Sequence, residues 1–483
     1  MLSLFTNFNK SRTAFSCYLL LACILSCKKL VQISPPVSSI TTTEVFSDSA
    51  DAASAILGVY SNMAYNGIGS DGNFANAGAT TYYGLSADEL LKFAPDPQTS
   101  NMITNTVLAD NPNTSYTWQV AFQYLYQVNA ILEGISSPSR IKQAVKNEFT
   151  GEAKFLRAFL NFYLVNIYGE IPLITSTDYQ SNAVAFRKPV SEVYQSIRND
   201  LLDAQDLLPA DYSAGGGEKT RGNQWAATAL LARVYLYQKN WGGADSASSI
   251  IINSGQFSLN FDLNSVFLKN NTEAILQWEN NSTVNTVTFN GTSEGYVFIP
   301  LDSSSPPHYY LTDPLLTAFE AGDQRRTAWV KTYTYTGDGH NYSYPFKYKL
   351  GNYQTAANAP VAEYYTVLRL AEQYLIRAEA KAQLNKLSEA IMDLNTIRNR
   401  ASLPPLSPLL NQSQLLAAVA QERRIELFAE WGHRWLDLKR TDQVAAAFQN
   451  ISYKAAYKPY QQLYPIPLTE ISTDINLTEN PGY

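Results

Sequence analysis

Cysteine and histidine are scarce in this chain of 483 residues, and their scarcity excludes several kinds of site. All three cysteines, Cys17, Cys23 and Cys27, lie near the N-terminus, so the rest of the chain cannot form a disulfide framework. The three histidines are scattered, with no His-x-x-x-His spacing and no thiol nearby; they are His308, His340 and His433. We therefore predict no zinc or other metal site, and no cofactor.

Charge is also low. Charged residues make up 16% of the chain, against about 25% in a typical globular protein. The formal charge is −6 and there is no basic run, which argues against nucleic acid as a partner. The chain instead has 32 tyrosines and many Asn, Ser and Thr residues. Rings mixed with neutral polar groups suit sugars, whose faces stack on rings and whose hydroxyls need donors and acceptors.

No apolar run is long enough to span a bilayer. The run Ala14 to Leu25 is apolar except for Ser16, but it is too short for a membrane helix. It follows Lys10 and Arg12, and a basic region before a short apolar run is typical of a secretory signal peptide.

The residues after this run resemble a lipobox, which is cleaved before a lipid-modified cysteine. The motif is Ile24-Leu25-Ser26-Cys27. We expect residues 1–26 to be a lipoprotein signal peptide, Cys27 to carry the lipid, and residues 27–43 to be a tether. The alternative is an ordinary signal peptide with an incidental cysteine. Removing residues 1–26 would change the formal charge to −8, because they carry two basic residues and no acidic one.

The most informative stretch is Asn147 to Pro172, which has apolar residues at helical spacing on two faces. One face comprises Phe149, Ala153, Leu156, Leu160, Tyr163 and Ile167, and the other Phe155, Phe159 and Phe162. A helix that is apolar on two faces is buried between layers. Gly169 suits the position just past its end, and Pro172 forbids continuation.

Two later segments share a spacing of small residues. Ala232 and Ala244 are twelve positions apart, and so are Ala378 and Ala390. This spacing is typical of the helix pair of a tetratricopeptide repeat. The two segments are far apart in the sequence, which favours a helical scaffold with long insertions over a simple solenoid.

Periodicity predicts the remaining elements. We expect helices at 44–64, 85–93, 118–135, 189–208, 363–385, 388–401 and 412–430. We expect a loop at 66–81 and no regular element at 94–115. The insertion 257–363 is rich in aromatic residues and has β-like runs at 273–279, 286–289, 296–301 and 329–334.

Four motifs resemble the hallmarks of the SusD/RagB family, which are nutrient-binding lipoproteins of the outer membrane in Bacteroidetes-type bacteria. They are FLRA at 155–158 with YGEIPL at 168–173, ERRIEL at 422–427, GHRWLDLKR at 432–440, and NPGY at 480–483. The resemblance implies a mainly α fold. Tetratricopeptide-like helical pairs would form a single SusD-like domain over residues 44–483, with an irregular, partly β insertion face.

The resemblance also implies a role. Such a protein would be lipid-anchored at the outer membrane and face the cell exterior. It would capture a glycan or oligosaccharide and deliver it to a SusC-like TonB-dependent transporter, without being an enzyme. The variable regions, about 66–115 and 257–363, are where such proteins hold ligand.

Aromatic and amide side chains in these regions are the candidate ligand-binding residues. They are Phe93, Asn101, Tyr296, Tyr309, Tyr310 and Tyr342. Rings would serve as stacking platforms, with polar groups fixing the sugar hydroxyls. Ordinary packing of an amphipathic ring is the alternative for each tyrosine.

Three features would favour an enzyme instead, either a glycan hydrolase or an esterase. Ser293 lies in a Gly-x-Ser-x-Gly motif, but a nucleophile elbow needs a helix after the serine, and 296–301 is β-like. The charged residues of 422–440 could line an active site, but at helical spacing they equally form ion pairs. Asp88 could suggest a glycoside hydrolase carboxylate, but we expect it to cap or pack its helix. A scaffold lipoprotein that binds only protein is a further rival.

The lipid anchor gives a direct prediction. Replacing Cys27 with alanine should release the protein from the membrane fraction, because the acylation site is lost and stable anchoring takes more than one signal. Cell fractionation with palmitate labelling measures this. A Cys17→Ala variant, which alters a cysteine within the leader, is the control. A Cys27→Ala protein that stays membrane-bound and labelled would contradict the prediction.

Overall fold

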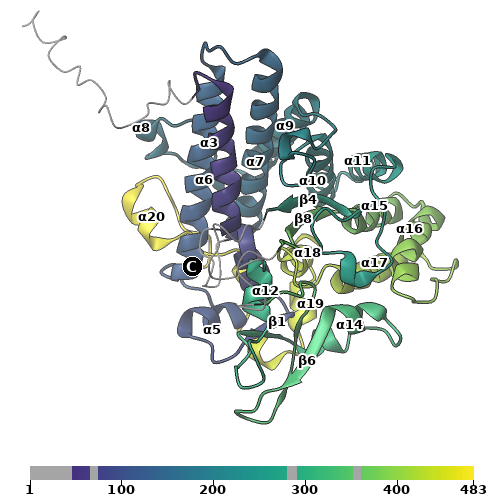
Figure 1. Cartoon of the computed structure of the whole chain (residues 1–483). Helices are drawn as coiled ribbons and strands as arrows, with labels where there is room; N and C mark the ends of the chain where they lie inside the picture. The colour runs from purple at the N-terminus through teal and green to yellow at the C-terminus, as the bar shows by residue number, and fades with distance from the viewer. Residues whose placement is uncertain (1–45, 66–73, 280–290, 352–359) are drawn as a thin grey trace, which may run out of the picture. The chain divides into compact units, whose positions relative to one another are not determined.

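The computed structural model describes residues 46–65, 74–279, 291–351 and 360–483. Most of them are helical, and among them no helix is both long and apolar enough to cross a membrane. The long helices α3, α6, α7 and α9 run side by side, and α15, α16 and α17 lie on the other side of the ribbon in Figure 1. The mainly α fold predicted from the sequence is confirmed.

The central helix is α7 (Gln143–Tyr168), and its two apolar faces are both buried as predicted. It packs against α3 (Ser49–Tyr65), α6 (Pro112–Ser136) and α9 (Val190–Leu207). It ends at Gly169, whose φ of 76° is in the region that favours glycine, and a Cβ there would lie 2.8 Å from a methyl carbon of Leu463.

Two charged side chains of α7, one buried and one partly buried, have partners on neighbouring segments. Glu152 is fully buried and pairs with Arg221. Arg157 donates to both Asp200 oxygens on α9, at 2.7 and 2.8 Å, and to the Asn129 side chain on α6, at 3.0 Å. These bonds hold the three helices in register. Each one replaces a hydrogen bond to water that the charged group loses when the helices pack.

The two predicted repeat segments are helical pairs, and they stack directly on one another. The first pair is α10 (Gln224–Tyr237) with α11 (Trp241–Asn253), and the second is α15 (Leu370–Gln383) with α16 (Leu387–Arg400). Helix α11 packs against α15, and α17 (Gln412–Glu426) continues the stack. The expectation of a scaffold with a long insertion is correct, but the insertion does not separate the pairs in space.

A pair of strands explains this adjacency. Strand β4 (Ala274–Trp278) follows the first pair, and β8 (Tyr365–Arg369) directly precedes α15. The two strands pair antiparallel, and their residues are buried. They bring the two ends of the intervening segment together, so that the helical stack continues past it.

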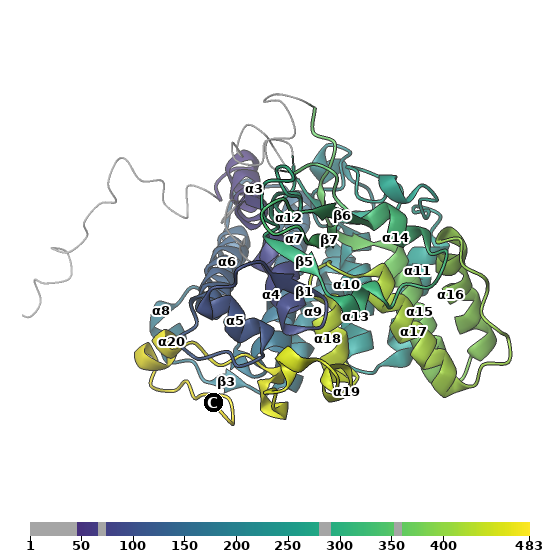
Figure 2. The same ribbon diagram turned by 90° about the horizontal axis from the view of Figure 1, so that it is seen from below.

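The remaining strands also form antiparallel pairs. Strand β1 (Leu90–Lys92) pairs with β5 (Tyr309–Leu311), β2 (Ile171–Pro172) with β3 (Arg187–Lys188), and β6 (Val330–Thr334) with β7 (Asn341–Pro345). Figure 2 shows β1, β5, β6 and β7 close together on the face viewed. Short helices complete the fold: α5 (Pro97–Ile103), α8 (Tyr179–Asn182), α12 (Ser293–Phe298), α13 (Asp313–Leu316), α14 (Gln324–Trp329), α18 (His433–Arg440), α19 (Val444–Phe448) and α20 (Leu468–Thr473).

Several predictions near the N-terminal end of the fold are wrong. Helix α3 begins at Ser49 and not near 44, because the Asp48 carboxylate accepts from the first free amides, those of Ala50 and Asp51. Residues 74–86, expected to be mainly loop, form a π-helical turn η1 (Phe74–Gly78) and α4 (Ala79–Ser86). Every residue of both elements is buried, so neither has a solvent-exposed polar face. Without such a face the sequence shows no helical period, and the helix was not predicted.

Other segments have the wrong type of element. The helix expected at 85–93 contains strand β1, and the segment 94–115 contains α5 and the start of α6. The run 296–301 overlaps helix α12, and the helix expected from 363 begins with strand β8. Short apolar runs do not distinguish a buried strand from a buried helix, and here the partner strand or the helix cap decides. The run 286–289 lies outside the described residues.

Burial of Leu160 gives the first prediction on stability. Leu160→Ala should lower the free energy of unfolding by about 2–5 kcal/mol, because α7 is packed on both faces and cannot close the cavity. Urea denaturation of the mature protein measures this. Leu409→Ala is the matched control, since Leu409 is 89% exposed. Equal stabilities for the two variants would show that α7 is not central to the core.

Candidate ligand-binding site

Two strand pairs position a group of aromatic side chains. In the β1–β5 pair, Leu91 lies opposite Tyr310, and the Phe93 amide donates to the His308 carbonyl at 3.0 Å. In the β6–β7 pair, Tyr333 lies opposite Tyr342. Strands β5 and β7 are in contact, which brings the two pairs into one layer. Segments near residues 90, 310 and 340 therefore meet on one face (Figure 2).

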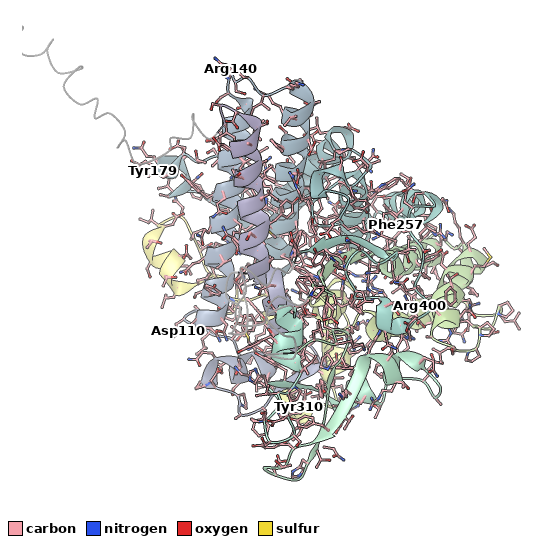
Figure 3. All side chains as sticks on the ribbon, viewed as in Figure 1. Asp110, Arg140, Tyr179, Phe257, Tyr310 and Arg400 are labelled. Atoms are coloured by element: carbon pink, nitrogen blue, oxygen red, sulfur yellow. The ribbon has the colours of Figure 1, made fainter. Side chains whose placement is uncertain are left out.

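The rings on this face touch in a continuous chain. We call Phe93, Tyr310, Tyr333, Tyr335 and Tyr342 the ring cluster. The Tyr342 ring centroid lies 5.0 Å from that of Tyr310, 5.7 Å from that of Phe93 and 6.5 Å from that of Tyr333. The Phe93 centroid is 5.6 Å from that of Tyr335. All five side chains are partly exposed, and Figure 3 labels Tyr310 near the lower end of the molecule.

Polar groups border the ring cluster. The Tyr342 hydroxyl donates to an Asp338 oxygen at 2.8 Å, and this bond raises the pKa of Tyr342 to about 12. The Tyr333 hydroxyl donates to the Ser305 carbonyl at 3.0 Å. The Asp338 carboxylate also accepts from the His340 amide, the main cause of its lowered pKa. The cluster therefore presents neutral phenols beside one carboxylate across the physiological pH range.

The other candidate residues lie elsewhere. Tyr309 is fully buried, and its ring packs 6.2 Å from that of Phe298, so it offers no exposed stacking face. Successive residues of a strand point to opposite faces, so an exposed Tyr310 implies a buried Tyr309. Tyr296 lies on α12 with its ring 6.3 Å from the His308 ring. Asn101 lies on α5, and its carbonyl accepts from the Thr106 amide at 2.8 Å.

Two members of the ring cluster were missed as candidates. Tyr333 and Tyr335 are two positions apart on or beside β6, so they share a face. The alternation Tyr333, Tyr335 and then Tyr342, Tyr344 across a turn containing Gly337 and Gly339 was the available signal, because it is typical of a hairpin with one aromatic face.

Ser293 lies at the start of helix α12, so the β-like run expected after it is wrong and a helix does follow the serine. Thr292 caps this helix by accepting from the Gly295 amide at 3.0 Å. Ser293 is buried, with an exposed fraction of 8%. A nucleophile elbow exposes its serine on a sharp turn, and this serine is not exposed.

The charged segment 422–440 forms ion pairs inside the protein. Glu426 has no exposed surface, and its carboxylate contacts Arg325, Arg369 and Arg400. Arg369 also pairs with Glu273 and Glu430, and Arg400 pairs with Glu273. We call these residues, Glu273, Arg325, Arg369, Arg400, Glu426 and Glu430, the ionic core. The interpretation of this segment as structural pairing is confirmed.

Asp88 belongs to a second group of ion pairs. Its carboxylate accepts from Arg434 Nε and from Arg424 Nη2, each at 2.7 Å. Although burial acts to raise it, these two guanidinium groups hold the pKa of Asp88 below its usual value. Asp88 lies between α4 and β1, so the expectation that it caps or packs its own helix is wrong; it pairs with two arginines instead. Within the described ranges, no three His, Cys, Asp or Glu side chains are grouped to hold a metal ion.

The fold and site define a class of protein: a tetratricopeptide-like helical scaffold with partly exposed rings on a strand-built insertion. The model of the SusD family matches residues 285–483, and the model described as "Starch-binding associating with outer membrane" matches residues 40–236. On these two matches, both halves of the chain resemble the SusD/RagB family.

Individual relatives agree with this assignment. SusD-like protein P25 of Formosa agariphila is 24% identical over 530 aligned residues, covering 96% of this chain and 98% of the relative. A SusD superfamily protein from Bacteroides vulgatus has a TM-score of 0.78 at 20% identity, covering 91% of this chain and 100% of that one. A laminarin-binding SusD-like protein has a TM-score of 0.74 at 23% identity, covering 90% of this chain and 99% of that one.

A buried ion pair beside the ionic core gives a prediction on pH. Glu372 accepts from Arg233 at 2.6 and 2.7 Å, and although burial opposes it, this partner lowers the pKa of Glu372 to about 2. The carboxylate therefore stabilises the fold fully above its unfolded pKa of about 4.5, and this contribution is lost as the pH falls through about 2. Glu372→Gln should cost about 3–5 kcal/mol near neutral pH, and progressively less as the pH falls.

Denaturant unfolding of both proteins from neutral pH down to about pH 2.5 measures the difference. The comparison isolates this group, because other buried carboxyls are common to both proteins. Glu389→Gln is the control, since Glu389 is 51% exposed in its ion pair with Lys381. A difference in stability that does not change with pH would contradict the assignment.

Proposed function

We propose that this protein is a cell-surface lipoprotein that captures a glycan or oligosaccharide and delivers it to a SusC-like TonB-dependent transporter. The observation that carries the proposal is the ring cluster, which joins residues from three distant parts of the chain into one partly exposed aromatic surface. Similarity to the SusD/RagB family supports the same role, and the family models and similar structures include starch-binding and laminarin-binding descriptions.

The chemistry of the cluster fits a neutral sugar. Tyrosine rings offer broad apolar faces and lose little entropy on binding, since each has only two side-chain torsions. The rings of Tyr310 and Tyr342 meet at 71°, and Phe93 meets Tyr342 at 81°, so the cluster presents faces in different directions. Such an arrangement suits successive units of a bent or helical oligosaccharide. Asp338, His340 and Asn341 at its edge carry groups that can bond sugar hydroxyls.

The anchoring and the delivery step complete the proposal. Residues 1–26 would be removed as a signal peptide, Cys27 would carry the lipid, and residues 27–43 would tether the domain outside the cell. The variable regions 66–115 and 257–363 would hold the ligand. The protein would act by binding and not by catalysis, because its acidic and basic side chains are largely neutralised in buried ion pairs.

Ring variants test the proposed site. A glycan array on the mature protein first selects the ligand, with laminarin and starch oligosaccharides included. Tyr310→Ala and Tyr342→Ala should each weaken binding by about 1–3 kcal/mol, because each removes a stacking face. Binding should depend weakly on salt, since a neutral sugar has no charge to screen. Isothermal titration calorimetry measures both effects.

Controls separate a specific site from general stickiness and from catalysis. Tyr179→Ala should bind as the parent does, because Tyr179 is 74% exposed and lies on α8, outside the cluster. Ser293→Ala should also bind normally, and long incubation should release no product. Full affinity in a Tyr310/Tyr342 double variant would show that the glycan binds outside the ring cluster. Product formation that Ser293→Ala abolishes would establish that the protein is an enzyme.

A further inference from the structure

A cavity of about 770 Å³ opens on the helical stack. It lies among the C-terminal end of α10, the start of α11, and α15, α17 and α18, whose positions can be followed in Figure 1. Its volume is within the range of about 300–1,000 Å³ that is typical of small-molecule sites. No residue of the ring cluster lines it.

The cavity has an exposed mouth and a buried charged floor. Lys239, Ala417, Ala420 and Thr441 at its mouth are exposed. At its floor, the Arg423 side chain is only 1% exposed. Because the floor is shielded from water, charges there interact more strongly than at an open surface.

Positive charge exceeds negative charge in the lining. The cationic residues are Lys239, Arg423, Arg424, Arg434 and Arg440, and the acidic ones are Glu379 and Asp437. Asp437 bridges Arg423 and Arg440, Glu379 pairs with Arg440, and Asp88 pairs with Arg424 and Arg434. Each of the four arginines therefore has a carboxylate partner, but even when Asp88 is counted with the lining, five cationic residues stand against three carboxylates.

Two guanidinium nitrogens of this group also lack an acceptor. Arg423 Nη1 and Arg424 Nε are buried and have no hydrogen-bond partner among the described residues. An unsatisfied buried donor destabilises a fold, and a charged one does so more strongly. A carboxylate in the cavity would supply the missing negative charge and can accept two parallel bonds from an arginine; for Arg423 Nη1 or Arg424 Nε to take part, that side chain has to turn toward the cavity.

We propose that this cavity binds a small organic anion through its carboxylate. Apolar side chains of Leu236, Trp241 and Leu416 line the same cavity and would contact the carbon skeleton of such a ligand. The ligand class includes an acidic sugar, such as a uronic acid, and a simple dicarboxylate, since both present the same charged group. This second site is independent of the glycan-binding role proposed for the ring cluster.

Calorimetry with three probes tests the site and distinguishes the sources. D-glucuronate is a sugar with a carboxylate, D-glucose has the same ring without it, and succinate has carboxylates without the sugar. Glucuronate or succinate should bind saturably and more weakly as salt is raised, and glucose should not bind. Tighter binding of glucuronate indicates an acidic sugar, and tighter binding of succinate indicates a simple dicarboxylate.

A variant at the mouth of the cavity avoids disturbing the buried ion pairs. Ala420 is exposed on α17, four residues before Arg424, so Ala420→Glu places a carboxylate where it competes for the same arginine. It should weaken binding about tenfold, as expected for a like charge a few ångströms from the ligand. Ala420→Gln is the matched control, since it has nearly the same size without the charge and should bind almost as the parent does. Unchanged melting temperatures verify that both variants fold.

Tyr342→Ala tests whether the cavity and the ring cluster bind independently. It should leave carboxylate binding unchanged, whether or not it weakens glycan binding. The proposal is overturned if neither glucuronate nor succinate binds saturably at millimolar concentration. It is also overturned if Ala420→Glu and Ala420→Gln bind the anion equally well.

Discussion

The structure depends on the burial of charge among helices that are otherwise apolar. Glu426 is the clearest case, because one fully buried carboxylate contacts arginines from three elements: Arg325 on α14, Arg369 at the end of β8 and Arg400 at the end of α16. A buried ion pair adds little net stability over an apolar contact, but removing one partner leaves an uncompensated charge. These residues therefore act mainly by selecting one arrangement of the helices. An alternative in which the insertion or α16 packs differently would leave several buried charges without partners. The aromatic residue Trp329 lies beside this group, and both Arg369 and Arg400 approach its ring.

The sequence predicted the elements whose pattern is repeated over several turns. Helix α7 was predicted because its apolar residues recur at helical spacing on two faces, and Gly169 marks its end. The two helical pairs were predicted from the spacing of Ala232, Ala244, Ala378 and Ala390, all of which are fully buried at the close contacts between helices. In these cases the local pattern and the tertiary packing require the same residues, so the packing can be predicted from the local sequence pattern.

The failures have a common physical origin. Helix α4 is buried on every side, so it has no polar face, and without one a helix has no visible period. Strand β8 was predicted as the start of the helix that follows it. Its strand conformation depends on pairing with β4, which lies nearly one hundred residues earlier. The ring cluster was only partly predicted, for a related reason. Phe93, Tyr310 and Tyr342 were chosen as isolated aromatics in variable regions, but their contacts follow from strand pairings that no local window contains. Tyr309 was chosen with them, although strand alternation buries it.

The pairing of β4 with β8 has a consequence for how such a protein changes over time. Because these two strands join the ends of the segment between them, the helical stack is closed without any contribution from the tip of that segment. Each doubling in the length of a closed loop adds only about 0.6 kcal/mol to the entropic cost of folding. Outside the residues that contact the ionic core, such as Arg325 and Lys347, the segment between the strands can therefore lengthen, shorten or be exchanged at small cost, while the scaffold keeps its geometry. In evolutionary terms the outer part of this segment is a replaceable cassette, and the same frame can acquire a new surface without being redesigned.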